Sequence, residues 1–147
     1  MEPRGYNIQT TLEPNDIASS CNFIITATPS KTPLLQADQI TKGTHITAMG
    51  SDTSEKQELE SKILKIADRV IVDSISQAET RGECFHALKD GNIDQAQIIE
   101  LGKIITNKAL QRRNDDEITI VDLTGVAVQD IQISKAVYEG FLSLKEN

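Results

Sequence analysis

Short apolar runs that end in small or hydroxylated residues recur along the chain. Residues 22–28 (NFIITAT) form a continuous apolar run that becomes polar only at its carboxyl end, which is typical of a strand buried on both faces of a parallel sheet. Residues 45–49 and 69–72 repeat this design, and residues 118–121 form a last apolar run. We expect four strands here and a weaker, short strand at residues 6–9.

Helical patterns occur between and after these runs. Residues 54–67 have apolar side chains at helical spacing, and Ser54 with Gln57 has the spacing of a capping box. Further helices are expected at residues 13–20 (with a proline in the first turn), 74–80, 83–89, 93–105 and 126–144. Strands that alternate with helices predict an α/β fold, a parallel sheet with flanking helices. The polar residues 107–117 are expected to form an exposed connection, and residues 1–5 to be disordered.

Composition restricts the class of protein. The 147 residues are about one domain, and with 38% apolar residues, 3% aromatics and no tryptophan the core must be aliphatic. A net charge of −7, with scattered Lys and Arg, argues against nucleic acid as a partner. No apolar run is long enough for a membrane span and the first residues contain no apolar signal region, so we expect no membrane partner and a cytoplasmic location.

The cysteines and histidines suggest neither a metal site nor a nucleophile. Cys21 and Cys84 have no CxxC spacing, and we expect Cys21 to be buried. Cys84 starts a predicted helix, where a lowered pKa can arise, but the inert alternative is favoured. His45 is expected to be a packed or capping histidine rather than a base, and His86 a surface or interface residue.

Small and hydroxylated residues follow three of the predicted strands. Because ligands of open parallel sheets bind beyond the carboxyl ends of the strands, these segments could line one site, although the same residues are also good turn and cap formers. The segments are Thr26-Ala27-Thr28-Pro29-Ser30, Gly50-Ser51-Asp52 and Asp122-Leu123-Thr124-Gly125.

Asp52 is the candidate proton-transfer residue. A carboxylate at the carboxyl end of a strand can exchange a proton beside a hydride-transfer centre. Lys56 lies four residues later, and the more common role of such a pair is a cap or a surface ion pair. Neither GxGxxG nor GxxxxGKS/T occurs in the chain, so the usual pyrophosphate-binding loop is missing from it.

Five segments in one order resemble the ornithine cyclodeaminase/mu-crystallin family. They are ITATPSKTPLL (25–35), KGTHITAMGSDTSEKQEL (42–59), ADRVIVDSISQAETRGE (67–83), IIELGKII (98–105) and ITIVDLTGVAVQDIQISKAVYE (118–139). The resemblance implies a partial Rossmann-like sheet, the second half of a doubly wound NAD(P)-binding domain. Family members are usually two-domain homodimers of about twice this length, active in amino-acid metabolism, and relative to them this chain is truncated.

By this resemblance Asp52 matches the catalytic aspartate of the family's GxD…K…EL motif, and Lys56 matches its lysine. The resemblance also implies that Thr26, Ala27 and Thr28 lie beside the nicotinamide ribose of NAD or NADP, with Thr124, Gly125 and Val126 near the nicotinamide ring. Gly50 belongs to the same motif. Without the glycine-rich loop and substrate domain, we expect these to be remnant site residues and the chain to bind no cofactor.

The missing first strand of the sheet has a physical consequence. In a doubly wound sheet the strand at residues 23–26 would lie beside that first strand, so its edge is left unpaired. We expect a homo-oligomer, most simply a two-fold dimer that covers this edge, with the long helix over residues 126–147 exchanged between subunits.

Three functions remain open from the sequence. The first is a truncated, non-catalytic module that forms an oligomer and binds a small molecule or a protein. The second is the C-terminal half of a split NAD(P)-dependent cyclodeaminase (an ammonia-lyase) or imine or amino-acid oxidoreductase, whose N-terminal half is encoded separately. The third is a domain that binds a nucleotide weakly.

Overall fold

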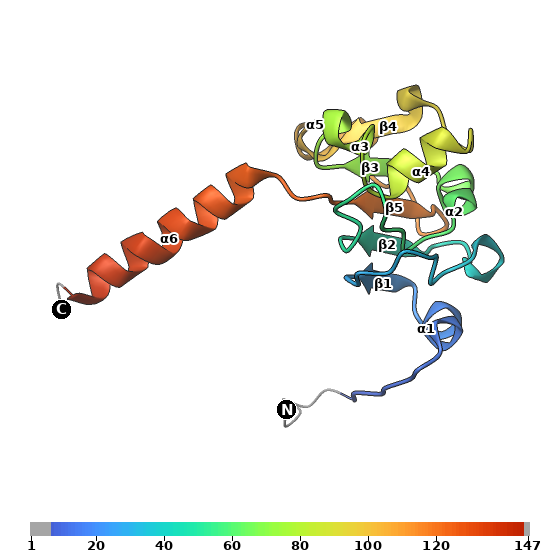
Figure 1. The fold of residues 1–147 in the computed structure, drawn as a ribbon, viewed down its shortest axis with the longest axis horizontal. Helices are drawn as coiled ribbons and strands as arrows, with labels where there is room; N and C mark the ends of the chain where they lie inside the picture. The colour runs from blue at the N-terminus through green and yellow to red at the C-terminus, as the bar shows by residue number, and fades with distance from the viewer. Residues whose placement is uncertain (1–6, 146–147) are drawn as a thin grey trace.

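One five-stranded parallel sheet organises the protein (Figure 1). The structure is a computed structural model that describes residues 7–145. The elements are α1 (Pro14–Ser20), β1 (Phe23–Thr26), η1 (Ala37–Gln39), β2 (His45–Ala48), α2 (Ser61–Ile66), β3 (Arg69–Val72), α3 (Ile75–Ala78), α4 (Glu83–Lys89), η2 (Gln95–Gln97), β4 (Ile98–Glu100), α5 (Leu101–Thr106), η3 (Lys108–Leu110), β5 (Thr119–Asp122) and α6 (Ala127–Lys145). The α/β fold predicted from the sequence is confirmed.

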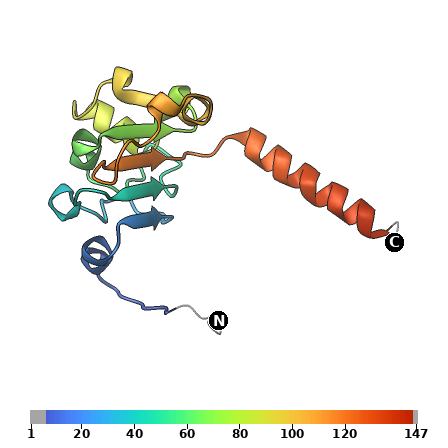
Figure 2. The same cartoon turned by 180° about the vertical axis from the view of Figure 1, so that it is seen from behind.

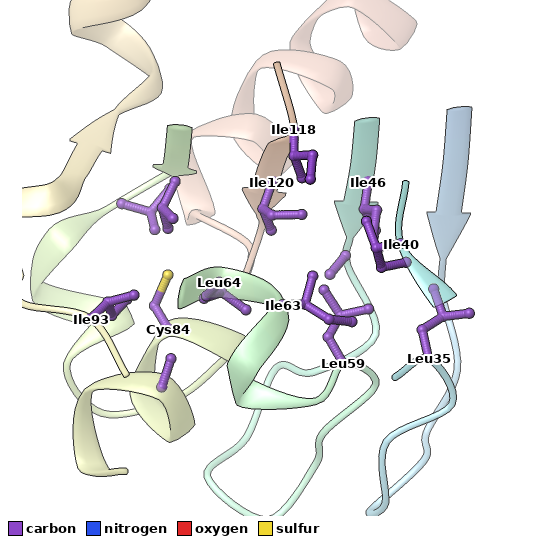
Figure 3. Packing of buried hydrophobic residues seen from close by; sticks show 14 of the residues in the cluster. Leu35, Ile40, Ile46, Leu59, Ile63, Leu64, Cys84, Ile93, Ile118 and Ile120 are labelled. Carbon is purple, nitrogen blue, oxygen red and sulfur yellow. The ribbon is translucent and has the colours of Figure 1, made fainter. Parts of the chain in front are cut away.

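The strands are ordered β1-β2-β5-β3-β4, so β1 forms one edge of the sheet as expected. One row of paired residues crosses all five strands: Ile24, Ile46, Ile120, Val70 and Ile98. All five are buried, which makes this row the centre of the aliphatic core. Helices α2 and α4 cover the row, and Figure 3 shows Ile63, Leu64 and Cys84 packed beneath the strands.

Burial of β1 on both faces was a wrong expectation. Ile24 and Thr26 are buried, whereas Phe23 and Ile25 on the opposite face are 61% and 56% exposed. Helices α3 and α5 contact β4 at the other edge of the sheet, and Phe23 and Ile25 leave one face of β1 exposed. Cys21, just before β1, is exposed rather than buried.

The helix expected at residues 54–67 is much shorter. Residues 51–60 are a loop and α2 begins only at Ser61, so the predicted capping box does not form. Instead, the Gln57 side chain donates hydrogen bonds to Leu59 O and Ser61 Oγ. The loop is favoured over a longer helix because it lets the Glu58 side chain accept hydrogen bonds from Thr26, Thr28 and Gly50.

Residues 93–105 do not form one helix either. They contain the 3-10 turn η2, strand β4 and helix α5. The apolar spacing is compatible with a helix, but Ile98 pairs with Val70 of β3, and this pairing overrides the local preference. Of the strand expected at residues 6–9, residues 7–9 are irregular, and Tyr6, like residues 1–5, lies outside the described residues.

The long C-terminal helix is confirmed as α6, and it projects away from the sheet (Figures 1 and 2). None of its described residues is buried. Its exposed apolar side chains are Val128, Ile131, Ile133, Val137, Tyr138, Phe141, Leu142 and Leu144. Across residues 7–145, no helix has the length and apolar character that a membrane crossing requires.

Candidate functional site

The carboxyl ends of β1, β2 and β5 meet at one edge of the sheet because neighbouring strands are parallel. Three segments follow them: the TAT loop (residues 26–28), the GSD turn (residues 50–52) and the LTG turn (residues 123–125). The structure therefore brings the segments chosen from the sequence to one edge, where a ligand of an open parallel sheet binds.

The side chain of Glu58 connects the TAT loop to the GSD turn through hydrogen bonds. Its side chain is fully buried. Oε1 accepts a hydrogen bond from Thr28 N (2.6 Å), and Oε2 accepts from Gly50 N (2.9 Å) and from Thr26 Oγ1 (2.8 Å). Three donors that converge on one carboxylate make strong, charge-assisted hydrogen bonds, so the two segments are held in a fixed relative position.

Gly50 allows this close approach. A Cβ at this position would lie 2.2 Å from Thr28 O, 2.4 Å from Thr28 N and 2.6 Å from Glu58 Oε1. Two of these atoms belong to the backbone, which cannot swing aside. Any larger residue would separate the GSD turn from the TAT loop.

A second buried carboxyl, Glu83, lies behind the first. It begins α4 and accepts hydrogen bonds from Glu58 N (2.8 Å) and Leu59 N (3.0 Å). Burial raises the pKa of Glu83 to about 8, its two backbone hydrogen bonds oppose this shift, and the negative charges of Asp122 and Glu58 add to it. At neutral pH Glu83 is therefore mainly protonated.

Asp122, at the end of β5, is the third buried carboxyl. Its Oδ2 accepts a hydrogen bond from Cys84 N (2.8 Å), while Oδ1 has no partner among the described residues. Burial raises the pKa of Asp122 to about 6, against the opposing effect of the Cys84 and Glu83 hydrogen bonds. The pKa of the Cys84 thiol is raised, by burial first and then by Asp122, so the helix start does not activate this cysteine.

The LTG turn is fixed by residues after β3. Asp73 Oδ2 accepts a hydrogen bond from Gly125 N (2.8 Å), and Thr124 Oγ1 donates to Gln77 Oε1 (2.8 Å). Gly82 also packs here: its φ is +88°, and a Cβ would lie 2.7 Å from both Asp122 Oδ2 and Thr124 Cγ2. The start of α4 therefore approaches the end of β5 closely.

Asp52 and Lys56 form an ion pair at the exposed side of this edge. Lys56 Nζ donates to Asp52 Oδ1 at 2.5 Å, and the two side chains are 26% and 55% exposed, respectively. The hydrogen bond from Lys56 is the largest cause that lowers the pKa of Asp52, and Arg81 contributes a smaller electrostatic effect. The pair belongs to a loop, so it is not a pair on a helix surface.

The backbone of this loop is held at the Lys56 carbonyl. Ser51 Oγ donates to Lys56 O (2.5 Å), and His86 Nε2 also lies within hydrogen-bonding distance of this oxygen (2.8 Å). Because a carbonyl only accepts, Nε2 carries the proton. His86 is thus a half-buried support of the loop rather than a simple surface residue.

His45 lies at the opposite end of β2 from the GSD turn. It is half-buried as expected, with Nδ1 2.6 Å from Thr119 Oγ1 and its ring stacked on Phe23. Burial lowers its pKa, with a smaller contribution from Arg112. Within the described residues no group of His, Cys, Asp and Glu is arranged to hold a metal ion.

The candidate binding residues divide into supporting and accessible groups. Thr26 and Thr124 are buried with their hydroxyls engaged, and Gly50 is enclosed by Thr28 and Glu58. Ala27 and Gly125 are exposed, and Thr28 and Val126 are half-buried. The accessible surface consists of small side chains, which fits the close approach of a flat ring.

Sequence reasoning gave no role to Glu58 or Glu83, and it included Asp122 only as the first residue of a segment that could line the site. Glu58 lies in the quoted GxD…K…EL motif, but nothing local distinguishes it from the neighbouring surface residue Glu60. Glu83 follows a glycine at the start of a helix, and a Gly-Glu pair in this position is too common to indicate a buried carboxyl.

The sequence and the fold of this chain are similar to those of known proteins. The model of the ornithine cyclodeaminase/mu-crystallin family matches residues 1–145.

The chain belongs to this family.

Among curated members of the ornithine cyclodeaminase/mu-crystallin family, alanine dehydrogenase of Archaeoglobus fulgidus is 41% identical over 143 residues, which is 97% of this chain and 44% of that protein. The solved structure of an archaeal alanine dehydrogenase dimer with bound NAD matches with a TM-score of 0.86 at 38% identity and the same coverages. Iminosuccinate reductase of Paracoccus denitrificans in complex with NAD+ matches with a TM-score of 0.78 at 37% identity, over 87% of this chain and 39% of that one. The chain thus spans less than half the length of these family members.

Proposed function

We propose that the edge formed by the TAT loop, the GSD turn and the LTG turn is the nicotinamide-side half of an NAD(P)-dependent site for an amino or imino acid. The observation that carries this proposal is the Asp52–Lys56 ion pair, which is exposed beside segments that buried carboxyls hold in place. Relatives with NAD in their structures, an alanine dehydrogenase and an iminosuccinate reductase, support it.

Asp52 and Lys56 would move the proton of the substrate nitrogen. The hydrogen bond from Lys56 lowers the pKa of Asp52, so this side chain is an ionised carboxylate at neutral pH, which is the form that can accept a proton from an amine. The Lys56 ammonium can return a proton in the opposite direction. A bound nicotinamide supplies or removes the hydride at the carbon that carries this nitrogen.

The residues present fit one part of a dinucleotide only. Ala27, Thr28, Gly125 and Val126 are accessible and small enough to lie against a nicotinamide riboside, and Thr26, Gly50 and Thr124 support them from behind. The chain contains no glycine-rich phosphate loop. We propose that it is therefore not catalytic by itself and acts either as an oligomeric binding module or with a separate N-terminal half.

We propose that the chain self-associates through two exposed surfaces, the outer edge of β1 and helix α6. The outer edge of β1 and the exposed Phe23 and Ile25 leave strand hydrogen-bonding groups and apolar area uncovered. Helix α6 has apolar side chains and no buried residue. A dimer that exchanges α6 between subunits would cover both kinds of surface.

Calorimetric titration of the purified chain with NAD+, NADH, NADP+ and NADPH tests the incomplete site. We expect no tight binding and no turnover. Mixing the chain with the N-terminal part of Archaeoglobus fulgidus alanine dehydrogenase should then restore alanine-dependent formation of NADH. Tight dinucleotide binding by the chain alone would contradict the non-catalytic module, and weak saturable binding would favour the nucleotide-binding alternative.

A further inference from the structure

Helix α4 is fixed to the end of β5 by its first turn. Cys84 N donates a hydrogen bond to Asp122 Oδ2 (2.8 Å), and the preceding Gly82 leaves so little space that a Cβ would lie 2.7 Å from Thr124 Cγ2. Cys84 and Ala87 also belong to the buried core. Because the core is closely packed, the helix cannot shift relative to the LTG turn without the loss of packing contacts.

The same helix holds the second half of the loop at residues 51–60. Glu83 is buried and accepts hydrogen bonds from Glu58 N (2.8 Å) and Leu59 N (3.0 Å). His86 Nε2 donates to Lys56 O (2.8 Å). Glu83 and His86 are three positions apart, so both side chains project from one face of the helix. Lys56 and the residues after it are therefore held at a fixed place on α4.

Asp52 is held from the strand that precedes it. Met49 N donates to Thr26 O (2.9 Å), which continues the pairing of β2 with β1, and Asp52 follows three residues later. The Asp52–Lys56 ion pair thus joins a residue positioned by β2 to a residue positioned by α4. Ser51 Oγ donates to Lys56 O (2.5 Å) and adds a second contact between the two halves of the loop. The geometry of the pair therefore depends on α4 as well as on β2.

We propose that His86 and Glu83 are positioning residues that hold the Lys56 ammonium at the Asp52 carboxylate. The inference rests on the proposed function, in which Asp52 accepts the proton of a substrate nitrogen and Lys56 returns one. Neither His86 nor Glu83 takes part in that proton transfer, since each acts through backbone atoms of residues 56–59. A displaced Lys56 would slow the transfer, because reaction rates depend steeply on the placement of the reacting groups.

The test measures the pKa of the Asp52 carboxyl in the full chain by NMR titration of its carboxyl carbon. The hydrogen bond from Lys56 is the largest cause that lowers this pKa, so the titration reports whether Lys56 is in place. His86→Leu removes the donor to Lys56 O and should move the pKa of Asp52 upward, towards that of an unpaired aspartate. His86→Gln, whose amide can donate to the same oxygen, should keep the pKa lower than His86→Leu does. Because Leu and Gln are both uncharged, a difference between these variants reports the hydrogen bond and not the charge of the imidazole.

Two further variants complete the design. Glu83→Gln leaves one acceptor oxygen for two backbone donors and should move the pKa of Asp52 in the same direction as His86→Leu. Ile118→Val removes a buried methyl group at the amino end of β5 and should lower the stability without a change in this pKa. Equal Asp52 pKa values in His86→Leu and His86→Gln overturn the role of His86, and a wild-type value in Glu83→Gln overturns that of Glu83.

Kinetics separate this inference from the proposed function. In an active complex with the N-terminal part of Archaeoglobus fulgidus alanine dehydrogenase, His86→Leu should lower kcat on the order of tenfold while the KM for NAD+ stays unchanged, and His86→Gln should restore kcat. A raised Asp52 pKa in His86→Leu with wild-type kcat would overturn the link to proton transfer. If the wild-type chain forms no active complex, the proposed function fails, whereas the NMR titration still decides how Lys56 is held.

Discussion

Glu58 Oε1 accepts a hydrogen bond at 2.6 Å from the backbone N of Thr28, thirty residues earlier in the chain. The other oxygen of Glu58 binds Gly50 N and Thr26 Oγ1. This buried carboxylate joins the carboxyl ends of the two adjacent strands β1 and β2.

Replacement of Glu58 by Gln should lower the free energy of unfolding by about 2 to 3 kcal/mol. The amide of Gln is a donor, so at least one of the three donors that face Glu58 would lose its acceptor. Urea denaturation measures the change, and hydrogen exchange should show faster exchange at the Thr28 and Gly50 amides. Glu55→Gln, which alters an exposed pair with Lys31, is the control. Unchanged exchange at both amides would refute the role of Glu58.

Gly50→Ala should destabilise the protein by about 2 kcal/mol or more, because the new Cβ would overlap the Thr28 backbone. The matched control is Gly102→Ala in α5, where a Cβ meets nothing within 4 Å. That change should stabilise the protein by up to about 1 kcal/mol through helix propensity. If thermal unfolding shows equal effects for the two variants, the close contact at Gly50 is absent in solution.

The stability of the protein should fall as the pH rises from about 5 to 8. The folded-state pKa of Glu83 is raised to about 8 from 4.5, so the folded state holds a proton that the unfolded state has already released in this interval. Binding more protons when folded means that stability is greatest at the acidic end and decreases through pH 8. Asp122, with a pKa raised to about 6, contributes in the same direction at the lower end of the interval.

The Glu83→Gln variant tests this prediction, since Gln imitates the protonated acid. Its free energy of unfolding should depend on pH less steeply than that of the wild type between pH 5 and 8. Glu79→Gln, an exposed change in the preceding segment, should keep the wild-type slope. Parallel curves for wild type and Glu83→Gln would show that Glu83 is ionised across the range.

Asp52→Asn should remove the activity of the complemented enzyme while leaving the melting temperature nearly unchanged. The Asp52 side chain is exposed, and among the described residues its one ion pair is with Lys56, so the fold depends little on it. The matched control is Asp38→Asn in η1, which is exposed and lies outside the candidate site. Full turnover by Asp52→Asn would exclude Asp52 as the residue that exchanges the proton.

Deletion of residues 127–147 should leave the sheet folded but reduce self-association. No described residue of α6 is buried, so the core loses no packing contact. Light scattering during gel filtration should report an oligomer for the full chain and a smaller species after the deletion. A monomeric full chain would contradict the exchange of α6.

Local sequence patterns determined the parts of this fold that depend on near neighbours. The apolar runs predicted β1, β2, β3 and β5, and the aliphatic composition predicted the core. The predictions were wrong at β4 and at residues 54–60, where the local pattern suits a helix. In β4 the pairing with β3 overrides this pattern, and at residues 54–60 the hydrogen bonds of the buried Glu58 do so.

The sequence by itself therefore determined the fold class, the family resemblance and the three segments at the strand ends. Only the tertiary structure decided that Glu58, Glu83 and Asp122 are buried carboxyls that hold these segments, and that the buried Nε of Arg81 has no hydrogen-bond partner among the described residues. The physical reason is that burial and hydrogen bonding of a charged side chain depend on residues far apart in the chain. Glu58 and Glu60 are almost adjacent in sequence, yet only one of them binds the backbone of both strand ends.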